Sequence, residues 1–247
     1  MNFIETICNS NRLLLGGHRG HLSDVRENTI ANFDQILPLG VDYIEIDIQL
    51  TRDDQAVIFH DRTLPNDSGL SGKIRDWTVQ QLKNAFDLCT LPEALAWCRT
   101  NQMSALLEIK QITAECEPAG TILASRVIEA IHRAEFQQNC IVFGIDQPIL
   151  RQIRSAAPDI PLGVIVPEPP ADPVALMKDL GTVMYLSYLK DLTSEAVETL
   201  HRAGYIVDGS VVNNFEMLDL ALSLRVDMIE SDYPDRIKAK ISGVSLN

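Results

Sequence analysis

The amino-acid sequence predicts an α/β fold and, within that class, a (β/α)₈ TIM barrel. Short apolar or β-branched runs alternate along the chain with segments of helical periodicity, which is the pattern of strands joined by helices. The runs number eight, as a closed barrel of this kind requires. The chain has 247 residues, and such barrels typically use about 250 residues as one domain. We therefore expect residues 1–247 to form a single domain.

The expected strands are short and lie between connections that are long enough to hold a helix. They cover residues 12–18, 43–49, 105–109, 140–145, 161–166, 183–188, 205–209 and 228–231. Helical periodicity is clearest at residues 30–37, 122–134, 195–203 and 215–224. Right-handed crossovers would place these helices outside the barrel and gather the carboxyl ends of the strands at one mouth, where the loops form the site.

The connection after the second strand is the longest, and we expect it to be elaborated. It spans about residues 51–104 and contains an extra strand that ends at His60 and Asp61, a Gly/Ser/Asp-rich stretch and a helical stretch at 78–86. A segment of this size buries a core of its own with difficulty. It is therefore expected to be an insertion in the barrel rather than a second domain.

Composition and charge exclude several classes of partner. The net charge is -13 and no Lys/Arg cluster is present, which argues against nucleic acid or an anionic membrane surface as the main partner. The five cysteines are scattered and odd in number, so a disulfide framework or zinc site is not expected and a reducing cytoplasm fits best. No run of eighteen apolar residues occurs, so we expect no stable membrane insertion and no signal peptide.

Two carboxylates share one face of the expected strand at 43–49. Residues two apart in a strand point the same way, so Glu45 and Asp47 face one side while the isoleucines between them face the other. Adjacent carboxylates repel unless a cation or proton lies between them. Glu108 is a third acid on an apolar strand, and three carboxylates suit Mg²⁺ or Ca²⁺. Arg19 and Lys110 would supply positive charge for an anionic substrate bound there.

Two histidines, His18 and His60, close apolar runs near these acids. Taken alone, a histidine at a strand end is more often structural than catalytic. Beside a metal and two cations, however, two histidines can divide proton transfer between an attacking and a leaving oxygen. The set therefore indicates phosphoryl chemistry.

The order and spacing of these motifs resemble the glycerophosphodiester phosphodiesterase family. The resemblance extends from residue 18 to residue 234 and depends on several short motifs together. These are His18-Arg19-Gly20, Arg26-Glu27-Asn28-Thr29, Glu45-Ile46-Asp47, Thr51-Arg52-Asp53, His60-Asp61, Glu108-Ile109-Lys110 and Ser231-Asp232-Tyr233-Pro234.

The resemblance implies a (β/α)₈ barrel in which His18 and His60 are the acid/base pair. It implies one divalent metal ion, Mg²⁺ or Ca²⁺, bound by Glu45, Asp47 and Glu108. It also implies that a small-molecule glycerophosphodiester is hydrolysed to glycerol 3-phosphate and an alcohol. In the mechanism usually proposed for the family, the neighbouring glycerol hydroxyl attacks first and water then opens the cyclic phosphate.

Two alternatives remain beside this function. One is a phosphodiesterase for a related substrate, a lysophospholipid or a sugar phosphodiester, that uses the same residues. The other is a barrel that only binds phosphodiesters, which would be natural if a histidine or carboxylate had been lost, and none has been. The sequence indicates neither the oligomeric state, nor the preferred metal, nor the alcohol group.

The chain departs from the family at two places expected to line the site. Gly144-Ile145 stands where the family commonly has Ser-Phe, and Ser210 stands where it commonly has tryptophan. Both changes remove rings that each bury on the order of 150 Å² or more, so we expect altered substrate choice with unchanged metal and histidine chemistry.

Other polar residues near these motifs are expected to be structural. Residues 27–29 are expected to cap a helix, and Asp61 is expected to orient His60. Asp232 is expected to hold the end of the last strand.

Overall fold

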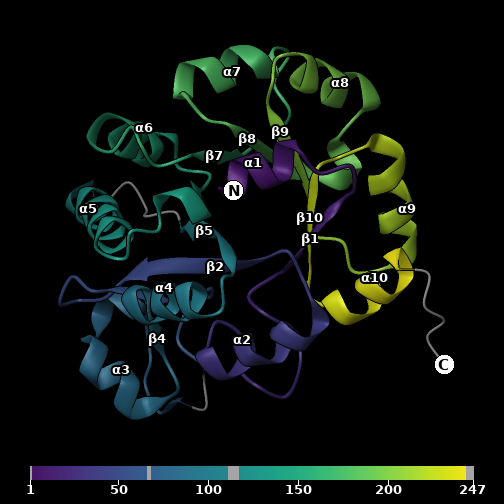
Figure 1. The fold of residues 1–247 in the computed structure, drawn as a ribbon. Helices are drawn as coiled ribbons and strands as arrows, with labels where there is room; N and C mark the ends of the chain where they lie inside the picture. Colours follow the sequence, from purple (N-terminus) through teal and green to yellow (C-terminus); the bar gives the residue numbers. More distant parts are fainter. Residues whose placement is uncertain (1, 66–67, 111–116, 243–247) are drawn as a thin grey trace.

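The computed structural model describes residues 2–65, 68–110 and 117–242. Eight parallel strands form most of a curled sheet (Figure 1). These strands are β1 (Leu14–Gly17), β2 (Tyr43–Leu50), β5 (Ser104–Ile109), β6 (Cys140–Phe143), β7 (Gly163–Ile165), β8 (Met184–Tyr188), β9 (Ile206–Ser210) and β10 (Met228–Ser231). All eight lie within two residues of the strands expected from the sequence.

The pairing of the strands follows the curl of the sheet. β1 pairs with β2, which pairs with β5, and β5 pairs with β6. In the other direction β1 pairs with β10, and the order continues through β9 and β8 to β7. A parallel bridge between Val142 of β6 and Leu162, just before β7, joins the two ends of this order. The first and last strands of the chain are therefore neighbours.

Helices surround the sheet on its outer side, and one helix covers an end of the curl (Figure 1). They are α1 (Phe3–Cys8), α2 (Ile30–Ile36), α3 (Val79–Ala85), α4 (Leu91–Thr100), α5 (Glu117–Arg133), α6 (Gln147–Ala156), α7 (Pro173–Leu180), α8 (Ser194–Arg202), α9 (Phe215–Leu224) and α10 (Pro234–Ile241). Several begin at a side chain that accepts a hydrogen bond from a backbone N–H of the first turn, as Thr29 does for α2 and Asn214 for α9. No helix of the described residues is long and apolar enough to cross a membrane.

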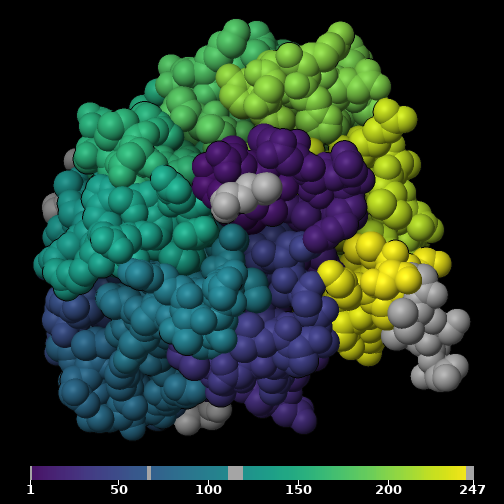
Figure 2. Space-filling view, viewed as in Figure 1, coloured from purple at the N-terminus to yellow at the C-terminus, as the bar shows by residue number. Residues whose placement is uncertain are grey.

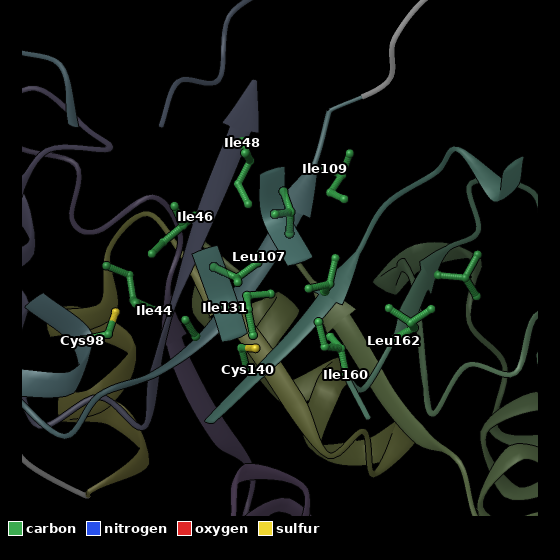
Figure 3. Packing of buried hydrophobic residues seen from close by; sticks show 14 of the residues in the cluster. Ile44, Ile46, Ile48, Cys98, Leu107, Ile109, Ile131, Cys140, Ile160 and Leu162 are labelled. Atoms are coloured by element: carbon green, nitrogen blue, oxygen red, sulfur yellow. The ribbon is translucent and has the colours of Figure 1, made fainter. Parts of the chain in front are cut away.

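Successive side chains of β2 point alternately to the apolar core and to the inside of the curled sheet. Ile44, Ile46 and Ile48 are buried in the apolar layer between the sheet and the helices, beside Leu107 and Ile109 of β5 (Figure 3). Residues of the opposite face point to the inside of the curl, where Tyr43 belongs to a separate apolar cluster. The acids of β2 therefore also face inward.

Helix α1 fills the end of the curl at which the strands begin. Phe3 and Ile7 pack among inward residues such as Leu14, and the rings of Phe3 and Tyr43 lie 5.7 Å apart. Figure 2 shows α1 across the centre of this face. The sequence analysis did not predict this helix, although a reciprocal cap between Asn2 and Glu5 marks its start. The apolar filling leaves the opposite end, where the strands finish, for polar chemistry.

The segment at 51–104 holds the extra strand and helix expected there. Strand β3 (Ala56–Ile58) pairs antiparallel with β2, and β4 (Cys89–Thr90) pairs antiparallel with β3. Their apolar side chains form a small cluster with α3, which includes Val57, Phe59 and Leu82. Residues 66–67, in the expected Gly/Ser/Asp stretch, lie outside the described residues.

Candidate active site

Three carboxylates meet inside the sheet near the ends of two neighbouring strands. Glu45 and Asp47 come from β2 and are buried, and Glu108 of β5 lies opposite Asp47 in the parallel register. One carboxylate oxygen from each lies within 4.8 Å of the other two. This group, called here the three-acid site, has the oxygen donors that a hard divalent cation prefers.

The three-acid site contains more negative charge than the neighbouring cations neutralise. Burial raises the pKa of Glu45 well above its usual value, and the nearby charges of Asp47 and Glu108 raise it further. Burial also disfavours ionisation of Asp47, but Lys110 and Arg19 outweigh it and lower the pKa of Asp47. Oε1 of Glu45 is buried and has no hydrogen-bond partner among the described residues. A divalent cation would replace the proton that Glu45 otherwise retains, so the residues fit a metal.

Two cationic side chains, for which the sequence analysis gave an anion-binding role as an expectation, border the three-acid site. Lys110 Nζ lies 2.6 Å from Asp47 Oδ1 and 2.9 Å from Glu108 Oε1. Arg19 Nε lies 3.3 Å from Asp47 Oδ2. The backbone N–H of Arg19 also donates to Glu45 Oε2 at 3.0 Å, because its left-handed backbone, with φ of 57°, turns the loop after β1 toward the acids.

His18 follows β1 and is held by a carboxylate from the far end of the chain. Its Nδ1 lies 2.5 Å from Asp232 Oδ1, directly after β10. A carboxylate with a lowered pKa only accepts hydrogen bonds, so Nδ1 carries the proton. Burial favours the neutral acid in Asp232, but the hydrogen bonds from His18 and Asn213 and the charges of His18 and Arg19 together outweigh it and lower the pKa. Nε2 then faces the acids, 4.0 Å from Glu45 Oε2.

Asp232 is itself fixed by the loop after β9. The Asn213 side chain donates to Asp232 Oδ2 at 2.5 Å and accepts from the backbone N–H of Asp232 at 2.8 Å. The sequence predicted only a structural role for Asp232, because its partner His18 lies 214 residues away.

His60 follows β3, and its Nδ1 lies 2.9 Å from Asp61 Oδ1, as the sequence predicted. The charge of His60 contributes to the lowered pKa of Asp47, so the ring lies near the three-acid site. His60 also lines a hollow of about 350 Å³ together with residues of the loop 21–28 and Phe59. Asn28, whose side chain donates to Asp47, also lines this hollow.

Two buried polar residues at the site were not predicted. Asn28, expected to cap a helix, donates from Nδ2 to Asp47 Oδ2 at 2.7 Å, while Thr29 makes the helix cap. Glu230 of β10 is buried and lies with His18 and Glu45 in a second group whose donor atoms are within 4.8 Å of one another. Its signal was a carboxylate inside an apolar strand, two residues after the inward-facing Met228.

The two departures from the family pattern have different local causes. A Cβ on Gly144 would lie 2.8 Å from the backbone oxygen of Ile109, so the chain passes too close for a side chain there. Ser210 Oγ donates to the buried Asp208 and accepts from the backbone N–H of Glu230 at 2.8 Å. Burial raises the pKa of Asp208 to about 7. Ser210 therefore belongs to a buried polar network next to the site.

The fold and the site together define a barrel-type enzyme that hydrolyses phosphoric diesters, with acids, cations and histidines where parallel strands end. The family model of glycerophosphoryl diester phosphodiesterases matches residues 18–236, so the chain belongs to this family. A glycerophosphodiester phosphodiesterase of Caldanaerobacter subterraneus is 25% identical over 92% of this chain and 96% of its own. One of Bacillus altitudinis is 27% identical over 89% of this chain and 94% of its own.

A solved structure shares the fold. An Oleispira antarctica phosphodiesterase in complex with the product sn-glycerol-3-phosphate superposes with a TM-score of 0.83 at 22% sequence identity, and the match covers 93% of this chain and 96% of that one.

Proposed function

We propose that the chain hydrolyses glycerophosphodiesters to glycerol 3-phosphate and an alcohol, with one divalent metal ion. The observation that carries this proposal is the convergence of three acids, two cations and the His18–Asp232 pair within one family of phosphodiesterases. The product sn-glycerol-3-phosphate bound to the Oleispira antarctica relative supports the substrate class.

Glu45, Asp47 and Glu108 hold the metal, which is Mg²⁺ or Ca²⁺. Their close oxygens and the unpartnered Oε1 of Glu45 support this assignment. The metal supplies positive charge against the negative charge that grows on the phosphoryl oxygens. Arg19 and Lys110 bind the same phosphate, since each lies against Asp47 at the edge of the three-acid site.

His18 and His60 move the protons. Because Asp232 keeps the proton on His18 Nδ1, Nε2 has a free lone pair and takes the proton of the glycerol hydroxyl next to the phosphate. That hydroxyl forms a bond to phosphorus, the bond to the alcohol oxygen breaks, and His60 protonates the leaving oxygen. In the second step water forms a bond to phosphorus and gives a proton to His60. The bond from phosphorus to the ring oxygen of glycerol breaks, and His18 returns its proton to that oxygen.

The whole chain acts as one barrel. Residues 1–247 form a single (β/α)₈ domain, and the segment 51–104 is an elaborated connection that brings His60 to the mouth. The antiparallel pairing of β3 with β2 supports this interpretation. The protein works in the cytoplasm on small molecules, which the four free cysteines among the described residues support.

The test is a coupled assay in which a phosphatase releases phosphate from monoester products but not from diesters. The substrates are glycerophosphocholine, glycerophosphoethanolamine, glycerophosphoglycerol and a lysophospholipid, each with Mg²⁺, Ca²⁺ or chelator. Turnover of the three glycerophosphodiesters that requires metal supports the proposal. Turnover of the lysophospholipid alone would favour the related-substrate alternative, and no turnover at all would favour a binding protein.

A further inference from the structure

A second group of donors lies directly beside the three-acid site and has a different chemistry. It consists of His18, Glu45 and Glu230, each offering one atom within 4.8 Å of the other two. We call this group the imidazole site. Glu45 belongs to both sites, whereas Glu230 belongs to the imidazole site alone.

The imidazole site holds buried acceptors that no described residue satisfies. Oε1 of Glu45 and Oε1 of Glu230 are buried without a hydrogen-bond partner among the described residues. Glu45 is 1% exposed and Glu230 is 3% exposed, so water does not freely reach these oxygens. Buried carboxylate oxygens are normally paired or bound to a metal.

His18 is oriented as a metal ligand. Its Nδ1–H is engaged by Asp232 at 2.5 Å, so Nε2 is the ring nitrogen left to face the carboxylates. A metal-binding imidazole nearly always donates its other ring N–H to a carboxylate or carbonyl in this way, which fixes the ring and raises its basicity. The side chain of His18 is 14% exposed, which leaves access for an ion from solvent.

The donors select a different kind of ion from the one that suits the three-acid site. Two carboxylates and one neutral imidazole balance the charge of a divalent ion, and imidazole favours Zn²⁺ and similar transition ions over Mg²⁺ or Ca²⁺. Zinc ligands lie about 2.1 Å from the ion and so about 3.4 Å from each other in tetrahedral geometry. Small side-chain rotations would bring the three donors to that spacing.

We propose that His18 Nε2, Glu45 and Glu230 form a second cation site that takes Zn²⁺ or a similar transition ion while the three-acid site holds Mg²⁺ or Ca²⁺. Binding at this site follows from the donors and does not depend on the catalytic role of His18. If His18 is the base, zinc bound to Nε2 prevents this nitrogen from accepting a proton. Zinc is then an inhibitor of hydrolysis.

The test is a titration of the chelator-treated full chain with Zn²⁺ by calorimetry, with Mg²⁺ in millimolar excess to fill the three-acid site. We expect about one zinc ion to bind. Glu230→Gln should weaken zinc binding by at least about tenfold, since a direct ligand is lost, and should change the affinity for Mg²⁺ by less than about threefold. Glu108→Gln is the matched control, and it should weaken Mg²⁺ binding and leave zinc binding within about threefold.

The same measurements can overturn the proposal. It is wrong if Mg²⁺ displaces zinc fully, or if Glu108→Gln weakens zinc binding while Glu230→Gln does not. Anomalous scattering at the zinc edge from crystals of the unsubstituted chain gives an answer that needs no variant. A zinc peak beside His18 Nε2 and Glu230 supports the site, and a peak only among the three acids contradicts it. Calorimetry and anomalous scattering both report zinc binding, so they give the same answer whether or not the chain hydrolyses glycerophosphodiesters.

Discussion

Asp232 Oδ1 lies 2.5 Å from His18 Nδ1, although the two residues are 214 positions apart in the sequence. The contact joins the loop after β1 to the end of β10, which pair as neighbouring strands. It fixes the tautomer of His18 and thereby decides which ring nitrogen faces the acids.

We expect Asp232→Asn to lower kcat by about 10²- to 10⁴-fold, because an amide can donate to Nδ1 and favour the wrong tautomer of His18. KM and thermal stability should change little. Steady-state kinetics with glycerophosphocholine measure the effect. Asp235→Asn is the matched control, since Asp235 lies 3.3 Å from His21 Nε2 in a similar but exposed pair. Equal kinetics for Asp232→Asn and the unsubstituted chain would show that catalysis does not depend on the orientation of His18 by Asp232.

Removal of the metal should abolish turnover, and Mg²⁺ or Ca²⁺ should restore it, because the three-acid site then lacks its cation. Glu108→Gln should raise the Kd for Mg²⁺ about tenfold or more without unfolding the protein, since active-site acids lie at the functional mouth. Calorimetry measures the Kd, and the exposed Glu198→Gln serves as control. Full turnover by metal-free protein would falsify the metal requirement.

Replacement of either histidine, His18→Asn or His60→Asn, should cost about 10²- to 10⁴-fold in kcat, the range for positioned acid/base groups. The double variant should lose less than the product of the two single losses, because the residues act as a unit. His132→Asn, at a helix-surface histidine 3.0 Å from Asp159, should leave kcat unchanged. Activity of His60→Asn close to that of the unsubstituted chain would mean that another group protonates the leaving oxygen.

Stability should fall as pH rises from about 4 to about 7 because burial raises the pKa of Asp208 from 3.8 to about 7. In that window the folded protein binds a proton at Asp208 that the unfolded chain has released, so unfolding becomes easier as pH increases. Asp208→Asn mimics the protonated acid and should lack this share of the loss, which is about 1.4 kcal/mol per unit of pKa shift.

Urea denaturation at pH 5 and pH 8, in chelator, measures the difference. Glu45 and Glu230 contribute to the pH dependence in both proteins, and Asp208→Asn also removes a charge that raises the pKa of Glu230, so the difference reports Asp208 together with its effect on Glu230. Parallel losses of stability in the two proteins would show that Asp208 is ionised in the folded state at both pH values.

The head groups choline, ethanolamine and glycerol should be accepted with less than about a thousandfold spread in kcat/KM. Ile145, which is exposed after β6, carries no ring, and Ser210 is engaged by the buried Asp208, so neither position offers a ring to the substrate. Missing apolar contacts weaken discrimination by only about 1 to 3 kcal/mol each. A preference of a thousandfold or more for one head group would show that another segment rebuilds the pocket.

The sequence predicted the elements whose signals are local and repeated. The eight strands follow from apolar runs, and the acids of β2 follow from alternation with Ile44 and Ile46. Helix α1 was missed because its six residues are too few to establish a helical period. Its cap at Asn2 was the only cue.

The partners of the site residues were harder to predict. Asn28 resembles any loop residue until β2 brings Asp47 to it. Glu230 lies in an expected strand, but its grouping with His18 and Glu45 depends on the pairing of β10 with β1. These contacts depend on tertiary packing between distant segments, which one sequence does not display.

The pairing of β1 with β10 limits when the sheet can close during synthesis of the chain. During synthesis β1 and its neighbour β2 emerge early. The other neighbour of β1, β10, emerges only after all the other strands of the sheet. Until then one flank of β1 has unpaired backbone groups, and His18 has no Asp232. A chain that ends before β10 is therefore open along one edge of β1 and lacks the oriented histidine, so we expect it to be inactive.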